Sequence, residues 1–378
     1  MGAAALNPRC HAGPLVPCAM VGAVAALSAY EGLGVAVHGS SGCWFYPSSL
    51  LRVDLGCTDL SSVDAMLGSE ERARATVESL LGRHQSVALV NTCVPAIAGE
   101  DLAGALSDLP VTVVDAPGFA GSAWTGHARA IAALHPVVDP GARTIGIDGL
   151  SPLDPFARGN LFEIERLLRL AGATPGARFA GGTLASLAHA PPVSVVANPA
   201  YAAGAGERAG DLLGLEAVLA TFERLAAGGG GIDAAPVAAE CAAAEERCAR
   251  ACDKFLRRHD PPRAALFGEG GYIGAAAGLL DRYLGAECVL GYRDVPPPGP
   301  WMAAPADDLD RVGDLLDRAE PDLVLGSSFE QRLRPGAAFV PLSAPIRGRW
   351  WLGAVPFAGI EGVLVTVEAV LNACAGAP

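Results

Sequence analysis

The sequence predicts an α/β protein in which parallel sheets are flanked by helices. Short runs rich in β-branched residues alternate with longer Ala- and Leu-rich stretches whose apolar residues recur every three or four positions. Loops containing Gly, Pro and Ser separate the two kinds of segment, as expected where crossover helices join parallel strands. We therefore expect a chain of three Rossmann-like domains.

The individual elements follow from these patterns. Strands are predicted at 34–38, 87–91, 111–116, 144–148, 193–197, 264–267, 288–292 and 323–325. Helices are predicted at 70–82, 160–171, 211–227, 238–259 and 307–319, and a further helix is expected to end the chain.

Two boundaries divide the chain. Turns with Pro and Gly at 139–143 and 150–154 flank a new strand, and the run of four glycines at 228–231 is costly in a helix or a strand. We expect a first domain at 1–140, which carries the candidate ligands Cys18, Cys43 and Cys93, a second at 141–231 and a third at 232–378.

The composition indicates a folded, acidic chain. Of 378 residues, 51% are hydrophobic and 18% charged, and the mean hydropathy is +0.34, which is far from a disordered profile. The net charge of −13 argues against nucleic acid and anionic membranes as partners. We find neither an apolar run long enough to span a membrane nor the features of a signal peptide. We therefore expect a cytoplasmic protein with reduced cysteines.

Three of the ten cysteines lie in loops that lead into helices. These are Cys18, Cys43 and Cys93. In parallel sheets such loops line the ligand crevice, where helix N-termini favour anions such as thiolates. Thiolates suit iron–sulfur clusters or zinc, and three of them leave one position of a four-ligand site open. Spacing alone leaves the alternative, small buried hydrophobic residues, equally open.

Four segments around the cysteines and Gly68 carry motifs. They are Pro-Cys-Ala-Met-Val-Gly-Ala at 17–23, Val-His-Gly-Ser-Ser-Gly-Cys at 37–43, Met-Leu-Gly-Ser-Glu-Glu-Arg at 66–72 and Val-Asn-Thr-Cys-Val-Pro-Ala-Ile-Ala-Gly-Glu-Asp at 90–101. These segments resemble motifs of the nitrogenase component family, which includes the nitrogenase subunits, cofactor-assembly scaffolds, protochlorophyllide reductase and methanogen tetrapyrrole reductases. Weaker similarities at 116–122, 159–168, 321–326 and 359–364 extend the resemblance over nearly the whole chain.

The resemblance implies a function and its partners. Cys18, Cys43 and Cys93 would bind one half of an iron–sulfur cluster, 4Fe–4S or P-cluster-like, at an interface with a homologous subunit in a dimer or tetramer. An ATP-dependent iron protein would supply electrons for the reduction of a small molecule. Because the chain contains no GxxxxGK[ST] motif, ATP hydrolysis would fall to that partner.

Departures from the family pattern narrow the range of expected substrates. Residues 144–231 contain no cysteine and residues 261–378 no histidine, although the nitrogenase cofactor needs one of each in these regions. Dinitrogen is therefore not the expected substrate. The short chain is closer to the tetrapyrrole reductases, but Ser40 and Ser41 stand where those enzymes usually have two prolines. A non-catalytic scaffold for metallocofactor assembly and an α/β binding protein with inert cysteines remain alternatives.

Several other residues allow both a functional and a structural interpretation. Cys241, Cys248 and Cys252 share one face of a predicted helix, as a core seam or, less favoured, as a second metal site. His38 either tunes the cluster or satisfies a backbone carbonyl, and 118–121 is interpreted as a close-packing loop facing the same crevice. Cys57, Cys288, Cys374 and Cys10 are interpreted as structural, although Cys10 with His11 could approach Cys18. The cluster Arg347, Arg349, Trp350 and Trp351 fits an interface or core better than a ligand site.

Overall fold

In the computed structural model, which describes residues 15–376, the strands form three parallel sheets and one short strand pair. The chain divides into two compact units. The first comprises the described residues up to 136 together with Ala180–Ala188, and the second comprises Val137–Phe179 and the described residues from 189 onward.

The first unit contains a four-stranded sheet in the order β3-β2-β4-β5. Its strands are β2 (Leu33–His38), β3 (Gly56–Cys57), β4 (Ser86–Asn91) and β5 (Val111–Asp115), and the short pair is β1 (Tyr30–Glu31) with β8 (Gly182–Thr183), after which η2 (Leu184–His189) begins. The central strands β2 and β4 are buried almost throughout, which explains the apolar runs in their interiors.

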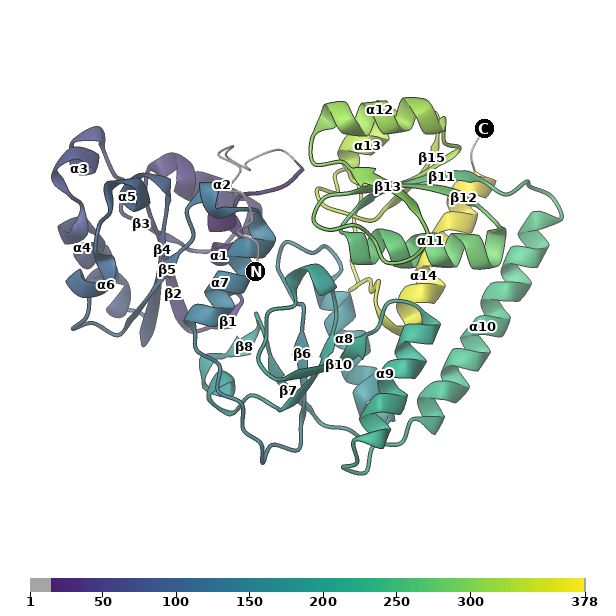
Figure 1. The fold of residues 1–378 in the computed structure, drawn as a ribbon, viewed down its shortest axis with the longest axis horizontal. Helices are drawn as coiled ribbons and strands as arrows, with labels where there is room; N and C mark the ends of the chain where they lie inside the picture. The colour runs from purple at the N-terminus through teal and green to yellow at the C-terminus, as the bar shows by residue number, and fades with distance from the viewer. Residues whose placement is uncertain (1–14, 377–378) are drawn as a thin grey trace. The chain divides into compact units, whose positions relative to one another are not determined.

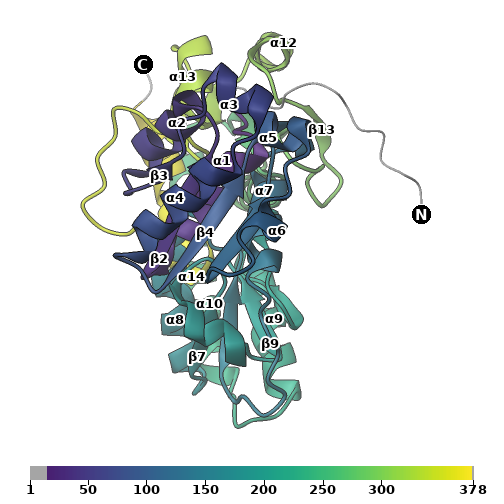
Figure 2. The ribbon, with the colours of Figure 1, turned by 90° about the vertical axis from the view of Figure 1, so that its left-hand side faces the viewer.

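Helices cover both faces of this sheet (Figures 1 and 2). One face packs against α4 (Glu70–Leu81) and α6 (Leu102–Ala105), and the other against α1 (Ala19–Ser28) and α7 (Ala123–Ala133). Gly22 of α1 and Gly126 of α7 let the two backbones touch, because a Cβ at either position would lie under 2 Å from a carbonyl oxygen of the other helix.

Four short elements follow the carboxyl ends of the strands. They are α2 (Ser41–Leu51) after β2, α3 (Ser62–Leu67) after β3, α5 (Cys93–Ala98) after β4 and η1 (Gly118–Ala120) after β5. The chain leaves β2 towards β3 on one side and β4 towards β5 on the other. The loops after β2 and β4 therefore diverge at a topological switch point, the usual place for ligands in open parallel sheets.

The second unit holds the other two sheets. One has the order β10-β9-β6-β7 and the other β13-β12-β11-β14-β15. The strands are β6 (Ile145–Asp148), β7 (Pro175–Arg178), β9 (Val193–Val196), β10 (Glu207–Asp211), β11 (Arg263–Gly268), β12 (Glu287–Tyr292), β13 (Met302–Pro305), β14 (Leu323–Gly326) and β15 (Ala338–Pro341). In chain order, the strands of the second of these sheets run 3-2-1-4-5, which matches the first five strands of the Rossmann order.

Five helices of the second unit share one continuous hydrophobic core, namely α8 (Ala157–Leu170), α9 (Leu215–Ala227), α10 (Ala235–Leu256), α11 (Gly270–Leu284) and α14 (Gly359–Ala375). The unit also contains η3 (Pro199–Tyr201), α12 (Leu309–Ala319) and α13 (Ser328–Leu333). The long helix α10 and the last helix α14 contact each other and α8, α9 and α11 (Figure 1).

The structure confirms the predicted α/β class with parallel sheets. All eight predicted strands and all five bounded helices are present, with ends that differ by no more than four residues. The glycine run at 228–231 joins α9 to α10, with Gly229, Gly230 and Gly231 at positive φ. The division at 140 and 231 remains our proposal. Within residues 15–376, no helix combines the length and apolarity needed to cross a bilayer.

Candidate metal site

Cys43 and Cys93 lie on the two sides of the switch point in the first sheet. Cys43 is in the first turn of α2, and Cys93 is the first residue of α5. Both thiols are therefore near the start of a helix, where the peptide dipoles favour a negative charge. The two side chains are neither fully buried nor fully exposed.

Cys18 is the residue before α1, and the structure brings it to Cys93. A Cβ at Gly118 would lie 3.2 Å from the Cys93 Sγ and 3.5 Å from the Cys18 Sγ. The Gly118 backbone N–H also donates to the Cys93 Sγ at 3.0 Å. The backbone of Gly118 thus lies close to both sulfurs with no room for a side chain, as expected for a close-packing loop.

These cysteines do not form a site for a single metal ion. Within residues 15–376, no three His, Cys, Asp or Glu side chains lie close enough together to hold one ion. A cluster makes a different demand, because each of its irons takes its own thiolate and the sulfurs stand further apart. Two cysteine sulfurs that approach the same glycine without forming a single-ion site therefore fit a multi-iron group better than zinc.

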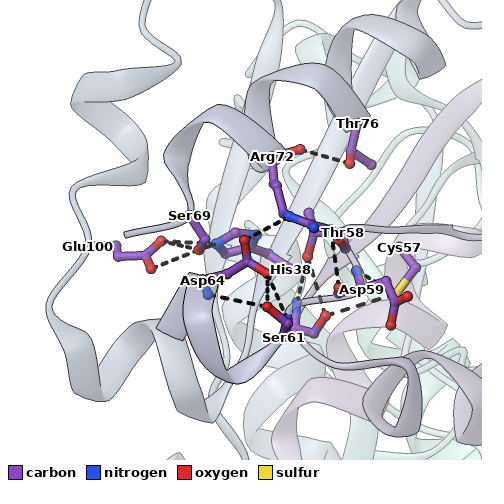
Figure 3. Close-up of polar contacts among 11 residues, drawn as sticks. His38, Cys57, Thr58, Asp59, Ser61, Asp64, Ser69, Arg72, Thr76 and Glu100 are labelled. Carbon is purple, nitrogen blue, oxygen red and sulfur yellow. Dashed lines mark hydrogen bonds and ion pairs between the residues drawn. The ribbon is translucent and has the colours of Figure 1, made fainter. Parts of the chain in front are cut away.

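His38, the last residue of β2, joins the loops that carry Cys43 and Cys93. Its carbonyl oxygen accepts hydrogen bonds from the Thr92 N–H at 3.2 Å and the Thr92 hydroxyl at 2.8 Å. Its ring contacts the side chains of Glu100 and Ser69 (Figure 3). The sequence had favoured a contact between the ring and a backbone carbonyl, which is not the one found. Glu100 and Ser69 belong to the 90–101 and 66–72 motifs, but their pairing was not foreseen.

Cys57, which we interpreted as structural, also lies at this edge. It ends β3, pairs in register with Val37, and its thiol faces the Gly39 carbonyl at 4.0 Å. The Asp59 N–H donates to its Sγ at 3.3 Å, and burial raises the pKa of the Cys57 thiol. A thiol next to the turn that leads to Cys43 is visible only once β3 is placed beside β2.

Large apolar side chains are exposed on the helices at the same edge. Leu67 is 81% exposed, Met66 76% and Ile97 75%, and α3, which carries the first two, packs against α5, which carries the third. Further exposed apolar residues on α2, α3, α5 and η1 are Phe45, Tyr46, Leu50, Val63, Val94 and Phe119. Exposed apolar groups gathered in this way are typical of a protein interface.

An acidic hollow of about 420 Å³ lies beside α5. Its polar wall includes Asn91, Glu100, Asp101 and Asp115, and Phe119 supplies an aromatic side. The Asn91 amide donates to Asp115 at 3.1 Å, while its Oδ1 is buried and has no partner among residues 15–376. The hollow therefore offers hydrogen-bond acceptors to a positively charged group.

The remaining cysteines with alternative readings lie elsewhere. Cys241, Cys248 and Cys252 are buried in the core of the second unit, as the core-seam reading predicts, and burial raises the pKa of all three thiols. Cys288 and Cys374 are partly buried, whereas Cys10 and His11 lie outside the described residues.

The basic and aromatic cluster near the carboxyl end is not part of the core. Trp350 is 91% exposed, and Arg349 and Trp351 line a pocket of about 80 Å³ with Phe156 and Phe357. The ring of Trp351 lies 5.5 Å from that of Phe156. This cluster therefore fits either a protein interface or a ligand site, and not the core.

Comparison with known proteins gives the chain a family. The model of the nitrogenase component 1 type oxidoreductases matches residues 18–375. The iron-molybdenum cofactor biosynthesis protein NifE of Clostridium pasteurianum is 28% identical over 163 residues, 38% of this chain and 36% of that protein. NifE of Bradyrhizobium diazoefficiens is 31% identical over 147 residues, 34% of this chain and 26% of that protein. The matches thus span about a third or less of these relatives.

Solved structures support the fold over a greater length. The structure titled nitrogenase Cp1 at pH 6.5 superposes with a TM-score of 0.78 at 18% identity, covering 99% of this chain and 94% of the other. Nitrogenase Cp1 at pH 5 gives a TM-score of 0.70 at 15% identity, with coverages of 96% and 89%. The chain belongs to the nitrogenase component 1 type oxidoreductase family.

Proposed function

We propose that this chain is the cluster-carrying subunit of a nitrogenase-like reductase that reduces a small molecule other than dinitrogen. Cys18, Cys43 and Cys93 would hold one half of a 4Fe–4S or P-cluster-like group. The convergence of Cys18 and Cys93 on Gly118 carries this proposal, because it occurs at the ligand edge of the sheet in a member of a redox family. A tetrapyrrole is one candidate substrate.

The chain's own residues have distinct tasks in this site. When bound, the cluster supplies one-electron transfer. Cys43 and Cys93 each lie at the start of a helix, where the peptide dipoles would favour a negatively charged cluster. The Gly118 N–H that donates to the Cys93 Sγ would stabilise negative charge on that sulfur and thereby adjust the potential. Reduced thiols are required, which suits the cytoplasm.

Two surfaces support the proposed partners. The exposed apolar residues on α2, α3 and α5 surround the cysteine loops, as expected if a homologous subunit covers the site and completes the cluster. The acidic hollow beside α5 favours a partner with basic side chains, and an ATP-hydrolysing iron protein is the partner that we propose for electron delivery.

A scaffold role is the second candidate function. The matched relatives from Clostridium and Bradyrhizobium are both named as cofactor biosynthesis proteins. A scaffold would hold metal without turning over a substrate. ATP-dependent electron flow through the chain to a reducible substrate therefore separates the two functions.

Anaerobic purification tests the cluster directly. We expect brown protein with iron and sulfide and with an EPR signal after dithionite reduction. Cys43→Ala and Cys93→Ala should lose most of the iron, whereas the control Cys374→Ala, on the last helix of the second unit, should retain it. Iron-free protein after anaerobic reconstitution, or equal iron in all four proteins, would refute the proposal.

Turnover is measured in a second experiment. The loaded chain is mixed with an iron-protein reductase, ATP and tetrapyrrole substrates, and oxidation of the chain's cluster is followed by EPR. ATP-dependent oxidation that requires a substrate supports the reductase. Stable cluster signals, together with transfer of metal to an acceptor protein, support the scaffold.

A further inference from the structure

His38, Ser69 and Glu100 form a buried polar triad in the first unit (Figure 3). The His38 Nε2 is 3.1 Å from the Glu100 Oε2 and 3.1 Å from the Ser69 Oγ. The Ser69 hydroxyl donates to the two Glu100 oxygens, at 2.7 and 2.8 Å. The His38 and Glu100 side chains are only 0% and 4% exposed, so these contacts replace almost all of their hydration.

The proton positions in this triad follow from burial. Desolvation lowers the pKa of His38 more than the neighbouring Glu100 and Glu70 raise it, so the ring is neutral at pH 7. Its Nδ1 has no partner among residues 15–376, and a hydrogen there would be a buried donor without an acceptor. The ring hydrogen therefore belongs on Nε2, from which it is donated to Glu100.

The triad connects segments that are far apart in the sequence. Glu100 is 62 residues from His38 and 31 from Ser69. His38 precedes the turn to Cys43, Glu100 follows α5, and Ser69 precedes α4. Three loops at one edge of the sheet thus meet in a single hydrogen-bonded group.

Helix α5 needs such an anchor. It has six residues, too few to be stable as an isolated helix, and its first residue is Cys93. Thr92 fixes the start of α5 through two hydrogen bonds to the His38 carbonyl. Glu100 fixes the segment beyond its end through the His38 ring, so both ends of α5 are attached to the same residue.

We propose that His38, Glu100 and Ser69 are positioning residues that fix Cys93 relative to the Cys43 turn. This inference rests on the proposed cluster function. Directional hydrogen bonds hold α5 in one orientation, which apolar packing alone would not do. The triad touches neither sulfur and acts through the backbone of its two loops.

The first test uses the metal-free full chain. Alkylation of Cys93 and Cys43 by iodoacetamide is followed by peptide mass spectrometry, with Cys374 as internal reference. Glu100→Ala should speed alkylation of Cys93 roughly tenfold, which corresponds to the loss of about one charge-assisted hydrogen bond from the local opening equilibrium. His38→Leu should behave similarly, whereas His38→Gln, whose amide N–H can replace the Nε2 donor, should remain close to wild type.

The second test uses the iron-loaded chain. Glu100→Ala and His38→Leu should shift the midpoint potential and broaden the EPR signal, because the thiolate geometry is no longer unique. Glu71→Gln, which changes an exposed carboxylate on α4, is the control and should alter neither. Ser69→Ala removes a single hydroxyl and supplies the same readouts if the larger substitutions prevent folding.

The outcomes distinguish a failure of the positioning role from a failure of the cluster function. Unchanged alkylation of Cys93 in folded Glu100→Ala, His38→Leu and Ser69→Ala would overturn the positioning role. If the wild-type chain binds no iron but Cys93 of these variants is alkylated faster, the cluster function is overturned and the positioning role of the triad stands. Equal effects of His38→Gln and His38→Leu would also count against the specific role of the Nε2 donor.

Discussion

Replacing Gly126 by Ala should destabilise the first unit through the contact between α1 and α7. A Cβ at this position would lie 1.7 Å from the Ala19 carbonyl oxygen, whereas ordinary contact begins at 3.4 Å. The obstacle is backbone, so no flexible side chain can move away. Because Ala19 follows Cys18, any separation of the helices also moves a proposed ligand.

The expected magnitude combines two opposing effects. Overpacking a tight contact costs about 1–3 kcal/mol, and a backbone clash of this depth belongs at the upper end. Alanine offsets about 1 kcal/mol of this through its higher helix propensity. We therefore expect Gly126→Ala to lower the free energy of unfolding by about 2 kcal/mol.

Guanidinium unfolding followed by circular dichroism, with hydrogen exchange of the α1 and α7 amides, measures this effect in the correct unit. Gly278→Ala on α11 is the control, because no atom lies within 4 Å of its added Cβ. It should be neutral or stabilising by up to about 1 kcal/mol. Equal free energies of unfolding for Gly126→Ala and Gly278→Ala would refute the expected clash between α1 and α7.

Three further predictions follow from single contacts. Gly118→Ala would place a Cβ 3.2 Å from the Cys93 Sγ, so iron content after reconstitution should fall while the circular dichroism spectrum stays unchanged; full iron loading would contradict the proposed site. Arg293→Leu should lower the free energy of unfolding by about 3–5 kcal/mol, because it leaves the buried Glu330 carboxylate without its ion-pair partner at 2.8 Å, and a loss below 1 kcal/mol in urea unfolding would speak against a strong pair. Burial raises the pKa of Glu269 from 4.5 to about 7, so its contribution to stability is fully present below pH 4.5 and is lost as the pH rises through 7. Unfolding measured from pH 4 to 8 should show wild type losing stability relative to Glu269→Gln over this range, and a constant difference would disprove the shift.

The sequence by itself determined the central elements of the fold. The interiors of strands such as β4 and β11 are buried, so their middle residues form unbroken apolar runs and their position is readable locally. Most of the strands that it did not reveal lie at sheet edges, namely β3, β7, β10, β13 and β15. Edge strands are short and partly exposed, and they carry a weak apolar signal.

The structure has Cys18, Cys43 and Cys93 at the starts of helices, as the sequence indicated, and their role as ligands stays a prediction. Which thiols meet was decided only by tertiary structure. Cys18 and Cys93 come together because Gly22 and Gly126 let α1 approach α7, and because Gly118 has no side chain to hold the two sulfurs apart. The partners of His38 likewise come from positions 31 and 62 residues away. Such contacts depend on strand order and helix packing, and local composition carries no record of either.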